Sequence, residues 1–223
     1  MRVAKRTTKA GLGAAMAGGK MGGGKQSERH EHDFYPTPPE VFEALFRRMP
    51  HLRGRKVWDP CCGDGVTDRV MEFHGCKVIG TDLIYRGYGM GGVNFLSQVK
   101  PRAGLLITNP PFDDDFPAAF VEHAMRMHVD EIWLLLKSTW QHASTRLSLR
   151  RRHCPAWKLE LAWRPDFNGK GNPTMECAWF GWARDWSQSF TKLDVIERPN
   201  MNSLDLLMAP AAANDETTQK QAG

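Results

Sequence analysis

The chain has 223 residues, 41% of them hydrophobic and 25% charged, and its formal net charge is +5. This size and composition are typical of one soluble globular domain with a sizeable core, and no apolar run is long enough to predict a membrane span or a secretory signal. Five cysteines, an odd number without a Cys-x-x-Cys pair, favour a reducing cytoplasm rather than a disulfide framework.

The two ends of the chain differ in composition from the middle. Residues 1–30 are rich in Gly, Ala and Lys, which predicts a disordered basic arm. Residues 209–223 predict a disordered tail, so that residues 31–208 form the single folded domain. The arm supplies much of the positive charge. It either contacts nucleic acid or serves only as a soluble tail.

The folded region begins with a predicted helix over residues 38–49. In Thr37-Pro-Pro-Glu40, Thr37 is the expected N-cap and Glu40 closes a capping box, and apolar residues then recur at helical spacing. Further helices are expected near residues 66–74, 116–127 and 140–151. Strands are expected near residues 55–59, 77–82, 104–109, 131–137, 157–163 and 175–183, with a short strand near 92–95. This alternation predicts an α/β fold in which a mostly parallel, twisted sheet carries helices on both faces.

A glycine-rich turn follows the first predicted strand. The strand ends at Asp59, and Gly63 and Gly65 then allow positive φ and a close approach of the backbone to a ligand. Asp82 ends the next apolar stretch, 23 residues after Asp59. An acid about 20 residues beyond such a turn can accept hydrogen bonds from ribose hydroxyls. The order of strand, turn, helix, strand and acid therefore predicts a site for a ribose-bearing ligand.

A second candidate site is Asn109-Pro-Pro-Phe112, which directly follows the apolar run of residues 104–108. Ligands of open α/β sheets bind at the carboxyl ends of the strands. Asn109 offers an amide oxygen, Pro110 has no N–H, and Phe112 supplies a plane for stacking. These groups suit a flat ligand with an exocyclic NH2 group. The alternative is that Asn-Pro is simply a good turn.

Together these blocks resemble the class I S-adenosylmethionine (AdoMet) methyltransferases, and more narrowly the small DNA adenine-N6 methyltransferases of phages and prophages. The resemblance is carried by the blocks Asp33–Pro39, Asp59–Gly65, Thr81–Gly89 and Asn109–Phe112, in that order. The segment Met175–Trp182 is similar to that family's terminal strand, which is antiparallel. The resemblance implies a Rossmann-like methyltransferase fold, AdoMet as cofactor, and the cytoplasm of a bacterium or phage-infected host.

The resemblance also implies the residues that bind the cofactor. Asp59 would lie near the methionine amino end, and Asp82 would bind the ribose hydroxyls. Asn94 would lie beside the adenine ring of the cofactor, at a position where many relatives have Asp. The remaining implied residues are Tyr35, Thr37, Gly63, Gly65, Asn94 and Phe95. For Thr37, this role is compatible with capping the first helix.

The reaction that the resemblance implies is direct attack of an amine on the AdoMet methyl group. The side-chain oxygen of Asn109 and the backbone carbonyl of Pro110 would accept hydrogen bonds from the NH2 group and favour its nucleophilic, pyramidal form. Phe112 would stack on the target ring. No metal or covalent intermediate is needed, so we expect Cys61 to be a packing residue and Asp113-Asp-Asp115 to cap a helix.

An adenine in duplex DNA must leave the base stack before it can react. The basic, glycine-rich loop over residues 164–173 is a candidate nucleic-acid contact through Arg164 and Lys170, and Pro111 is a further expected substrate contact. A second basic cluster consists of Arg146, Arg150, Arg151 and Arg152. The alternative is an ordinary hairpin loop and a solvated basic helix.

The favoured function is therefore methylation of adenine N6 in DNA. One alternative is methylation of an RNA base or of a protein glutamine amide, because enzymes of both kinds also use Asn-Pro-Pro followed by an aromatic residue. Another is a non-catalytic nucleic-acid-binding module. The sequence leaves the target site and the oligomeric state open.

Overall fold

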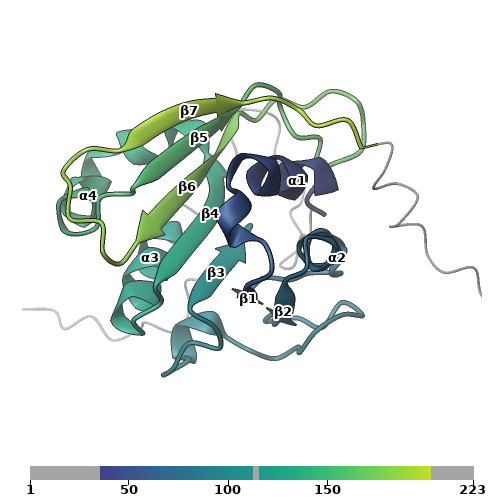
Figure 1. Cartoon of the computed structure of the whole chain (residues 1–223), viewed down its shortest axis with the longest axis horizontal. Coiled ribbons are helices and arrows are strands. Elements are labelled where there is room, and N and C mark those ends of the chain that lie inside the picture. Colours follow the sequence, from purple (N-terminus) through teal and green to yellow (C-terminus); the bar gives the residue numbers. More distant parts are fainter. Residues whose placement is uncertain (1–35, 113–115, 202–223) are drawn as a thin grey trace, which may run out of the picture.

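A seven-stranded sheet forms the centre of the domain (Figure 1). The computed structural model describes residues 36–112 and 116–201, so the predicted arm over residues 1–30 and the tail over residues 209–223 lie outside the described residues. The strands are β1 (Lys56–Asp59), β2 (Lys77–Gly80), β3 (Leu105–Thr108), β4 (Glu131–Lys137), β5 (Trp157–Leu161), β6 (Cys177–Ala183) and β7 (Lys192–Ile196). Their order across the sheet is β2-β1-β3-β4-β6-β5-β7.

The strands are mostly parallel, as the alternation of strands and helices predicts. β2, β1, β3 and β4 run parallel to one another. β6 lies between β4 and β5 and is antiparallel to both, which confirms the antiparallel strand expected near residues 175–183. β7 pairs parallel with β5 at the edge of the sheet.

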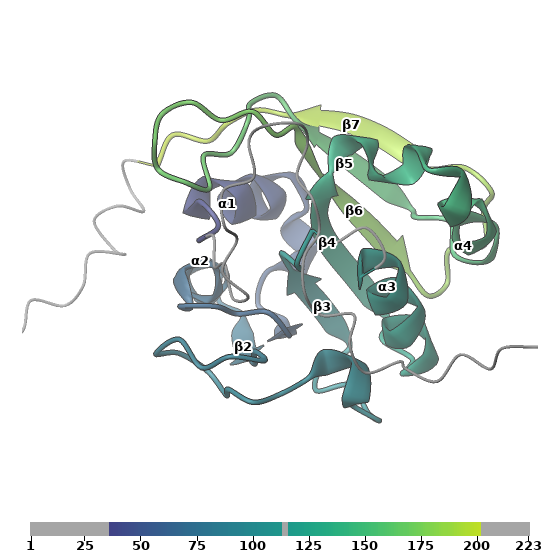
Figure 2. The same cartoon turned by 180° about the vertical axis from the view of Figure 1, so that it is seen from behind.

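Helices cover both faces of this sheet, as expected (Figures 1 and 2). The α-helices are α1 (Pro39–Arg48), α2 (Val66–Phe73), α3 (Phe116–Arg126) and α4 (Leu147–Arg152). The 3₁₀ turns are η1 (Pro50–Leu52), η2 (Phe95–Ser97), η3 (Ser138–His142) and η4 (Ser144–Arg146). Side chains of α1 and α2 pack on one face, and side chains of α3 and α4 pack on the other. In the described part of the chain, no helix has the length and apolar character to span a membrane.

The central strand β4 is apolar between its two end residues, without the alternation of apolar and polar residues seen in half-buried strands. Trp133 and Leu135 belong to the core cluster under α1 and α2. Ile132, Leu134 and Leu136 belong to the cluster under α3. Because both faces of the strand are buried, every residue from 132 to 136 is apolar, as is typical of a strand covered by helices on two sides.

Three expected elements differ in the structure. Residues 92–95 do not form a strand, because the Asn94 side chain instead accepts a hydrogen bond from Leu96 N and starts the turn η2. The helix expected over residues 140–151 is broken into η3, η4 and the short α4. Ser and Thr are frequent in that segment, and their side chains compete for backbone hydrogen bonds. Strand β7 was not predicted. Its apolar Leu193 and Val195 face solvent, which hides the usual pattern.

The capping box predicted at Thr37 and Glu40 is also wrong. Pro38 occupies the N-cap position of α1, and no side chain caps the helix there. Glu40 instead pairs with Arg198 at 2.9 Å. Thr37 remains free to bind a group from another element, as described below.

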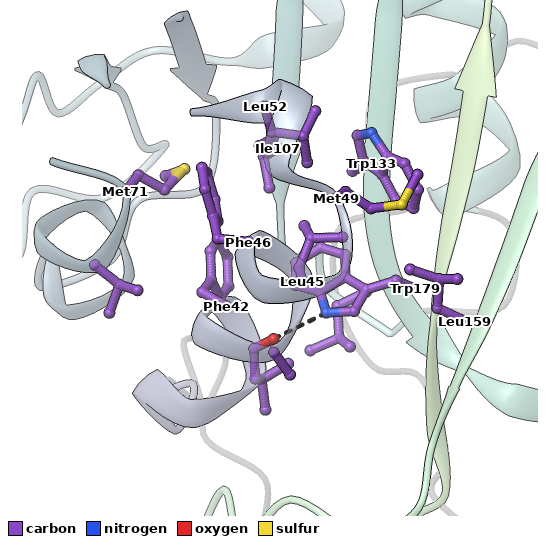
Figure 3. Close-up of a cluster of buried hydrophobic side chains, with 14 of the residues drawn as sticks. Phe42, Leu45, Phe46, Met49, Leu52, Met71, Ile107, Trp133, Leu159 and Trp179 are labelled. Carbon is purple, nitrogen blue, oxygen red and sulfur yellow. Dashed lines mark hydrogen bonds between the residues drawn. The ribbon is translucent and has the colours of Figure 1, made fainter. Parts of the chain in front are cut away.

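A tryptophan buried under α1 is hydrogen-bonded to that helix (Figure 3). The indole Nε1 of Trp179 in β6 donates to the backbone oxygen of Val41 at 3.0 Å, and both groups are buried. The Phe42 ring meets the same indole edge to face, with centroids 4.9 Å apart. This contact fixes α1 on the sheet beside the end of β3.

We expect Trp179→Phe to lower the free energy of unfolding by about 2–4 kcal/mol, because it leaves a cavity and a buried carbonyl without a donor. Urea denaturation measures the change. Trp186→Phe is the matched control. Its Nε1 also donates to a backbone oxygen, that of Phe190, but the bond is exposed. A loss at Trp179 no larger than the loss at Trp186 would show that the buried bond does not anchor α1.

Candidate functional site at the carboxyl edge of the sheet

Three predicted site residues come together because their strands are parallel neighbours. β1 lies between β2 and β3, so the carboxyl ends of all three strands share one edge of the sheet. Asp59 ends β1, Asp82 follows β2, and Asn109 follows β3. The sheet thus collects an acid near the glycine turn, a second acid and an amide on one side of the molecule.

The glycine turn is tied to Asp82. Gly63 and Gly65 have φ of 57° and 78°, so both use the left-handed region that favours glycine. The backbone N–H of Gly63 donates to Asp82 Oδ2 at 3.0 Å, and the N–H of Ile84 donates to Oδ1 at 2.9 Å. Each carboxylate oxygen keeps a further lone pair. Asp82 therefore holds the turn and still has acceptor capacity for a ligand hydroxyl.

Asp59 is buried and linked to β3. Its Oδ1 accepts from Cys61 N at 2.9 Å and from Thr108 Oγ1 at 2.6 Å. Its Oδ2 has no donor among the described residues. Burial raises the pKa of Asp59 to about 6, against the lowering effect of hydrogen bonds. The side chain is thus still largely ionised at neutral pH.

A second buried acid, Asp68 of α2, was missed by sequence reasoning. Its side chain is completely buried, and as a carboxylate it would have no donor in the described part of the chain. Burial first, and then the neighbouring charge of Asp59, raise the pKa of Asp68 to about 10. A proton on Asp68 can be shared with Asp59 in a hydrogen bond between the two side chains. The signal in the sequence was an acid on the buried stripe of a helix, three residues before Met71.

Tyr88 closes the outer side of the glycine turn. A Cβ atom on Gly65 would lie 2.3 Å from the Tyr88 ring, so only glycine fits there on steric grounds as well as for its φ. The Tyr88 hydroxyl donates to Glu72 Oε1 of α2 at 3.2 Å. Tyr88 thereby holds the segment after β2 against α2.

Asn109 presents an unpaired oxygen. Its Nδ2 donates to Thr37 Oγ1 at 2.8 Å, which links the end of β3 to the residues before α1. Its Oδ1 is buried and has no donor in the described ranges. Pro110 is buried and Pro111 is exposed. A buried acceptor without a donor is costly, and such a group at the end of a strand is suited to receive a donor from a ligand.

The loop over residues 164–173, which is distant in sequence, brings a second aromatic ring to the Asn109–Phe112 block. Phe167 meets the Phe112 ring edge to face, with centroids 5.9 Å apart. Asp166 holds the loop by accepting from the N–H of Asn168 at 3.2 Å and of Gly171 at 2.6 Å. These hydrogen bonds, that of Gly171 first, lower the pKa of Asp166. The loop predicted to contact a substrate therefore packs against the Asn-Pro-Pro-Phe block.

The other predicted substrate contacts lie around the same loop. Arg164 is exposed and pairs with Glu176 at 2.7 Å. Lys170 is exposed near the tip. In the predicted basic cluster, Arg150 donates to Gln141 at 3.3 Å and Arg152 pairs with Glu122. The role of these side chains toward nucleic acid stays a prediction.

The remaining predicted cofactor residues have structural contacts. Asn94 Oδ1 caps η2. Phe95 is 4% exposed and stacks on Phe120 at a centroid distance of 3.8 Å, which places the ring in the core under α3. Their cofactor role stays a prediction. Tyr35 and the acidic run of residues 113–115 lie outside the described residues.

Neither thiol chemistry nor a metal centre is indicated at this edge. Burial raises the pKa of the Cys61 thiol well above its ordinary value, so no reactive thiolate is available at neutral pH. Within residues 36–112 and 116–201, no group of three or more His, Cys, Asp or Glu side chains is placed to hold a metal ion.

No family model matches the chain, and no curated protein matches it in sequence. Solved structures match it in fold. A Thermoplasma acidophilum protein superposes with a TM-score of 0.52 at 19% identity over 68% of this chain and 89% of that one. The modification subunit of a proposed type I restriction enzyme from Vibrio vulnificus superposes with a TM-score of 0.51 at 14% identity, over 68% of this chain and 44% of that one. A Pyrococcus horikoshii protein proposed to be an RNA methyltransferase superposes with a TM-score of 0.50 at 16% identity, over 64% of this chain and 81% of that one.

At these identities the likeness shows the fold. The chain has the expected Rossmann-like methyltransferase fold, in which a mostly parallel sheet carries helices on both faces. This chain spans less than half of the Vibrio vulnificus subunit. The reaction therefore has to be inferred from the site residues.

The buried acid pair makes stability depend on pH. The folded protein keeps the Asp68 proton up to about pH 10, whereas the unfolded chain releases it near the ordinary value of 3.8. Through this group, the free energy of unfolding therefore falls as the pH rises between these values. Asp68→Asn has no proton to lose. We expect its stability relative to the wild type to rise between pH 5 and pH 8, by at most ~1.4 kcal/mol per pH unit.

Urea denaturation of the two proteins at pH 5 and pH 8 measures this difference. Asp185→Asn, at an exposed acid, is the control for a general charge effect. Parallel pH profiles for Asp68→Asn and the wild type would contradict a proton held at Asp68.

Proposed function

We propose that this protein transfers a methyl group from AdoMet to the exocyclic N6 amine of adenine in DNA. The observation that carries the proposal is the buried Asn109 oxygen without a donor, at the strand end beside the glycine turn. The fold supports the proposal, since both nucleic-acid-related neighbours with TM-scores of 0.50 or more share it.

The residues present fit the cofactor. Asp82 is anchored by Gly63 and retains lone pairs for the ribose hydroxyls. Asp59 suits the ammonium group of the methionine part, since a pKa of about 6 leaves this buried carboxylate ionised at neutral pH. Bound AdoMet would supply an electrophilic methyl group on a sulfonium.

The chain's own residues would act on the acceptor amine. Asn109 Oδ1 and the Pro110 carbonyl accept hydrogen bonds from the NH2 group, which directs the nitrogen lone pair toward the methyl group and stabilises the positive charge that develops. Phe112 holds the flat ring by stacking. The main contribution is positioning, which supplies about 7–11 kcal/mol in well-oriented reactions.

DNA is the proposed substrate because the four sequence blocks resemble those of phage-type DNA enzymes and the chain is basic, with a net charge of +5. An RNA base is the second candidate, because the Pyrococcus horikoshii neighbour is a proposed RNA methyltransferase. Methylating DNA, RNA and a glutamine peptide with labelled AdoMet, followed by mass spectrometry of the digested products, separates these substrates. Absence of any heat or thermal shift with AdoMet would instead favour a non-catalytic nucleic-acid-binding module.

The central prediction concerns Asn109. We expect Asn109→Ala to lower kcat for tritium transfer from AdoMet to DNA by about 100- to 1,000-fold, the usual effect of losing one preorganised hydrogen-bonding group in the transition state. AdoMet binding, measured by calorimetry, should persist because Asp82 and the glycine turn are unchanged. Full activity in Asn109→Ala would refute the assigned role.

Thr37 provides a finer test of the same geometry. Its hydroxyl is the partner of Asn109 Nδ2, so Thr37→Val should leave the amide free to rotate. We expect kcat to fall about 10- to 100-fold in Thr37→Val, because small displacements of a reacting group cost this much. Thr37→Ser keeps the hydroxyl and should retain most of the activity. Equal kcat values in the two variants would show that the hydroxyl does not position Asn109.

A further inference from the structure

A cavity of about 200 Å³ opens beside Phe112 at the same edge of the sheet. Its walls include Phe112, Lys137, Thr139, Trp140 and Arg146. Lys137 ends β4, whose neighbour β3 runs parallel to it and leads to Asn109. Ligand sites for drug-sized molecules usually measure about 300–1,000 Å³. This smaller space suits a single chemical group rather than a whole cofactor.

Among the described residues, the polar side chains on the cavity wall can all donate hydrogen bonds. Lys137 brings an ammonium group, Arg146 a guanidinium group and Thr139 a hydroxyl. The Arg146 guanidinium lies 5.2 Å from the centre of the Trp140 ring and donates to the Trp140 backbone oxygen at 2.5 Å, so it is held in place. A wall of this kind suits an anion with several acceptor oxygens.

One of these donors, the Lys137 ammonium, lacks an acceptor. Among the described residues, no hydrogen bond or ion pair is formed by the Lys137 ammonium. Glu160 of β5, which accepts from Ser138 at 3.0 Å, is already paired with Lys158 at 2.5 Å. The folded chain thus leaves the Lys137 ammonium at this cavity for another molecule.

We propose that this cavity is a phosphate subsite, in which Lys137 binds a backbone phosphate of the nucleic acid whose base lies on Phe112. The assignment rests on the proposed function for the position of the base. It makes Lys137 a substrate-binding residue and favours a nucleic acid over a protein, because the amide of a glutamine substrate carries no anion at a fixed distance from the reacting nitrogen.

Binding of a fluorescein-labelled, 12-nucleotide single-stranded DNA, measured by anisotropy between 50 and 200 mM NaCl, tests the subsite. We expect Lys137→Gln to weaken binding about 5- to 10-fold and to reduce the slope of log K against log [NaCl] by about 0.7, the value for one lost phosphate contact on a single strand. Lys137→Arg should keep both. Lys77→Gln is the matched control, because Lys77 starts β2 at the opposite, amino edge of the sheet and is exposed. Unchanged affinity and slope in Lys137→Gln would overturn the subsite.

A change in the DNA provides an independent test, because its main result comes from the wild-type protein. Each phosphate next to the target adenine is replaced in turn by a neutral methylphosphonate. We expect one of these replacements to weaken binding to the wild-type protein about 5- to 10-fold, the same loss as in Lys137→Gln. Lys137→Gln should show no further loss there. If no position produces a loss in the wild type, the subsite is refuted. If only a glutamine peptide is methylated and its KM depends on Lys137, the anion is a protein carboxylate and the proposal is also refuted.

These outcomes separate the subsite from the reaction. Lys137-dependent DNA binding without any methyl transfer by the wild type would overturn the proposed function and leave the phosphate subsite standing. Methyl transfer to DNA without any effect of Lys137→Gln on DNA binding would support the proposed function and overturn the phosphate subsite.

Discussion

The short hydrogen bond from Thr108 Oγ1 to Asp59 Oδ1 links the two halves of the candidate site. Both groups are buried, and each is the last residue of its strand. The bond therefore fixes the carboxyl end of β3 against that of β1. Asn109 follows Thr108 directly, and the glycine turn follows Asp59. The distance between the amide corner and the turn thus depends on one buried polar contact and on the parallel pairing of β1 with β3.

Most of the unpaired buried polar groups lie along this edge of the sheet. The indoles of Trp58, Trp179 and Trp182 each donate to a protein oxygen. Atoms without a partner in the described residues occur on Asp59, Asn109, Trp140 and Trp163, which lie at or just after the ends of β1, β3, β4 and β5. Two more residues carry such atoms, Asp68 in α2 and Arg102 before β3. Buried polar groups without partners cost stability, so their concentration at one edge is typical of a functional site rather than of a structural core.

Only part of the site follows from local sequence patterns. Asp82 and Asn109 were identified because each follows an apolar strand, a pattern within a few residues. Asp68 was missed because its burial depends on how α2 packs beside β1. The roles of Thr37 and Phe167 likewise depend on contacts with residues 72 and 55 positions away, Asn109 and Phe112. Local spacing carries no information about such pairs. The capping box at Thr37 failed for the same reason, since the hydroxyl has a tertiary partner.

Local patterns in the chain were enough to predict the α/β class, the boundaries of the inner strands and the two candidate loops, because strands buried on both faces need long apolar runs and glycine turns need particular residues. Three features became visible only in the folded chain: β7 completes the sheet, Asp59 and Asp68 share a buried space, and Lys137 and Phe112 border one cavity. The physical reason is that pairing order, burial and the local electric field arise from segments far apart in the chain, whose packing is set by the whole fold.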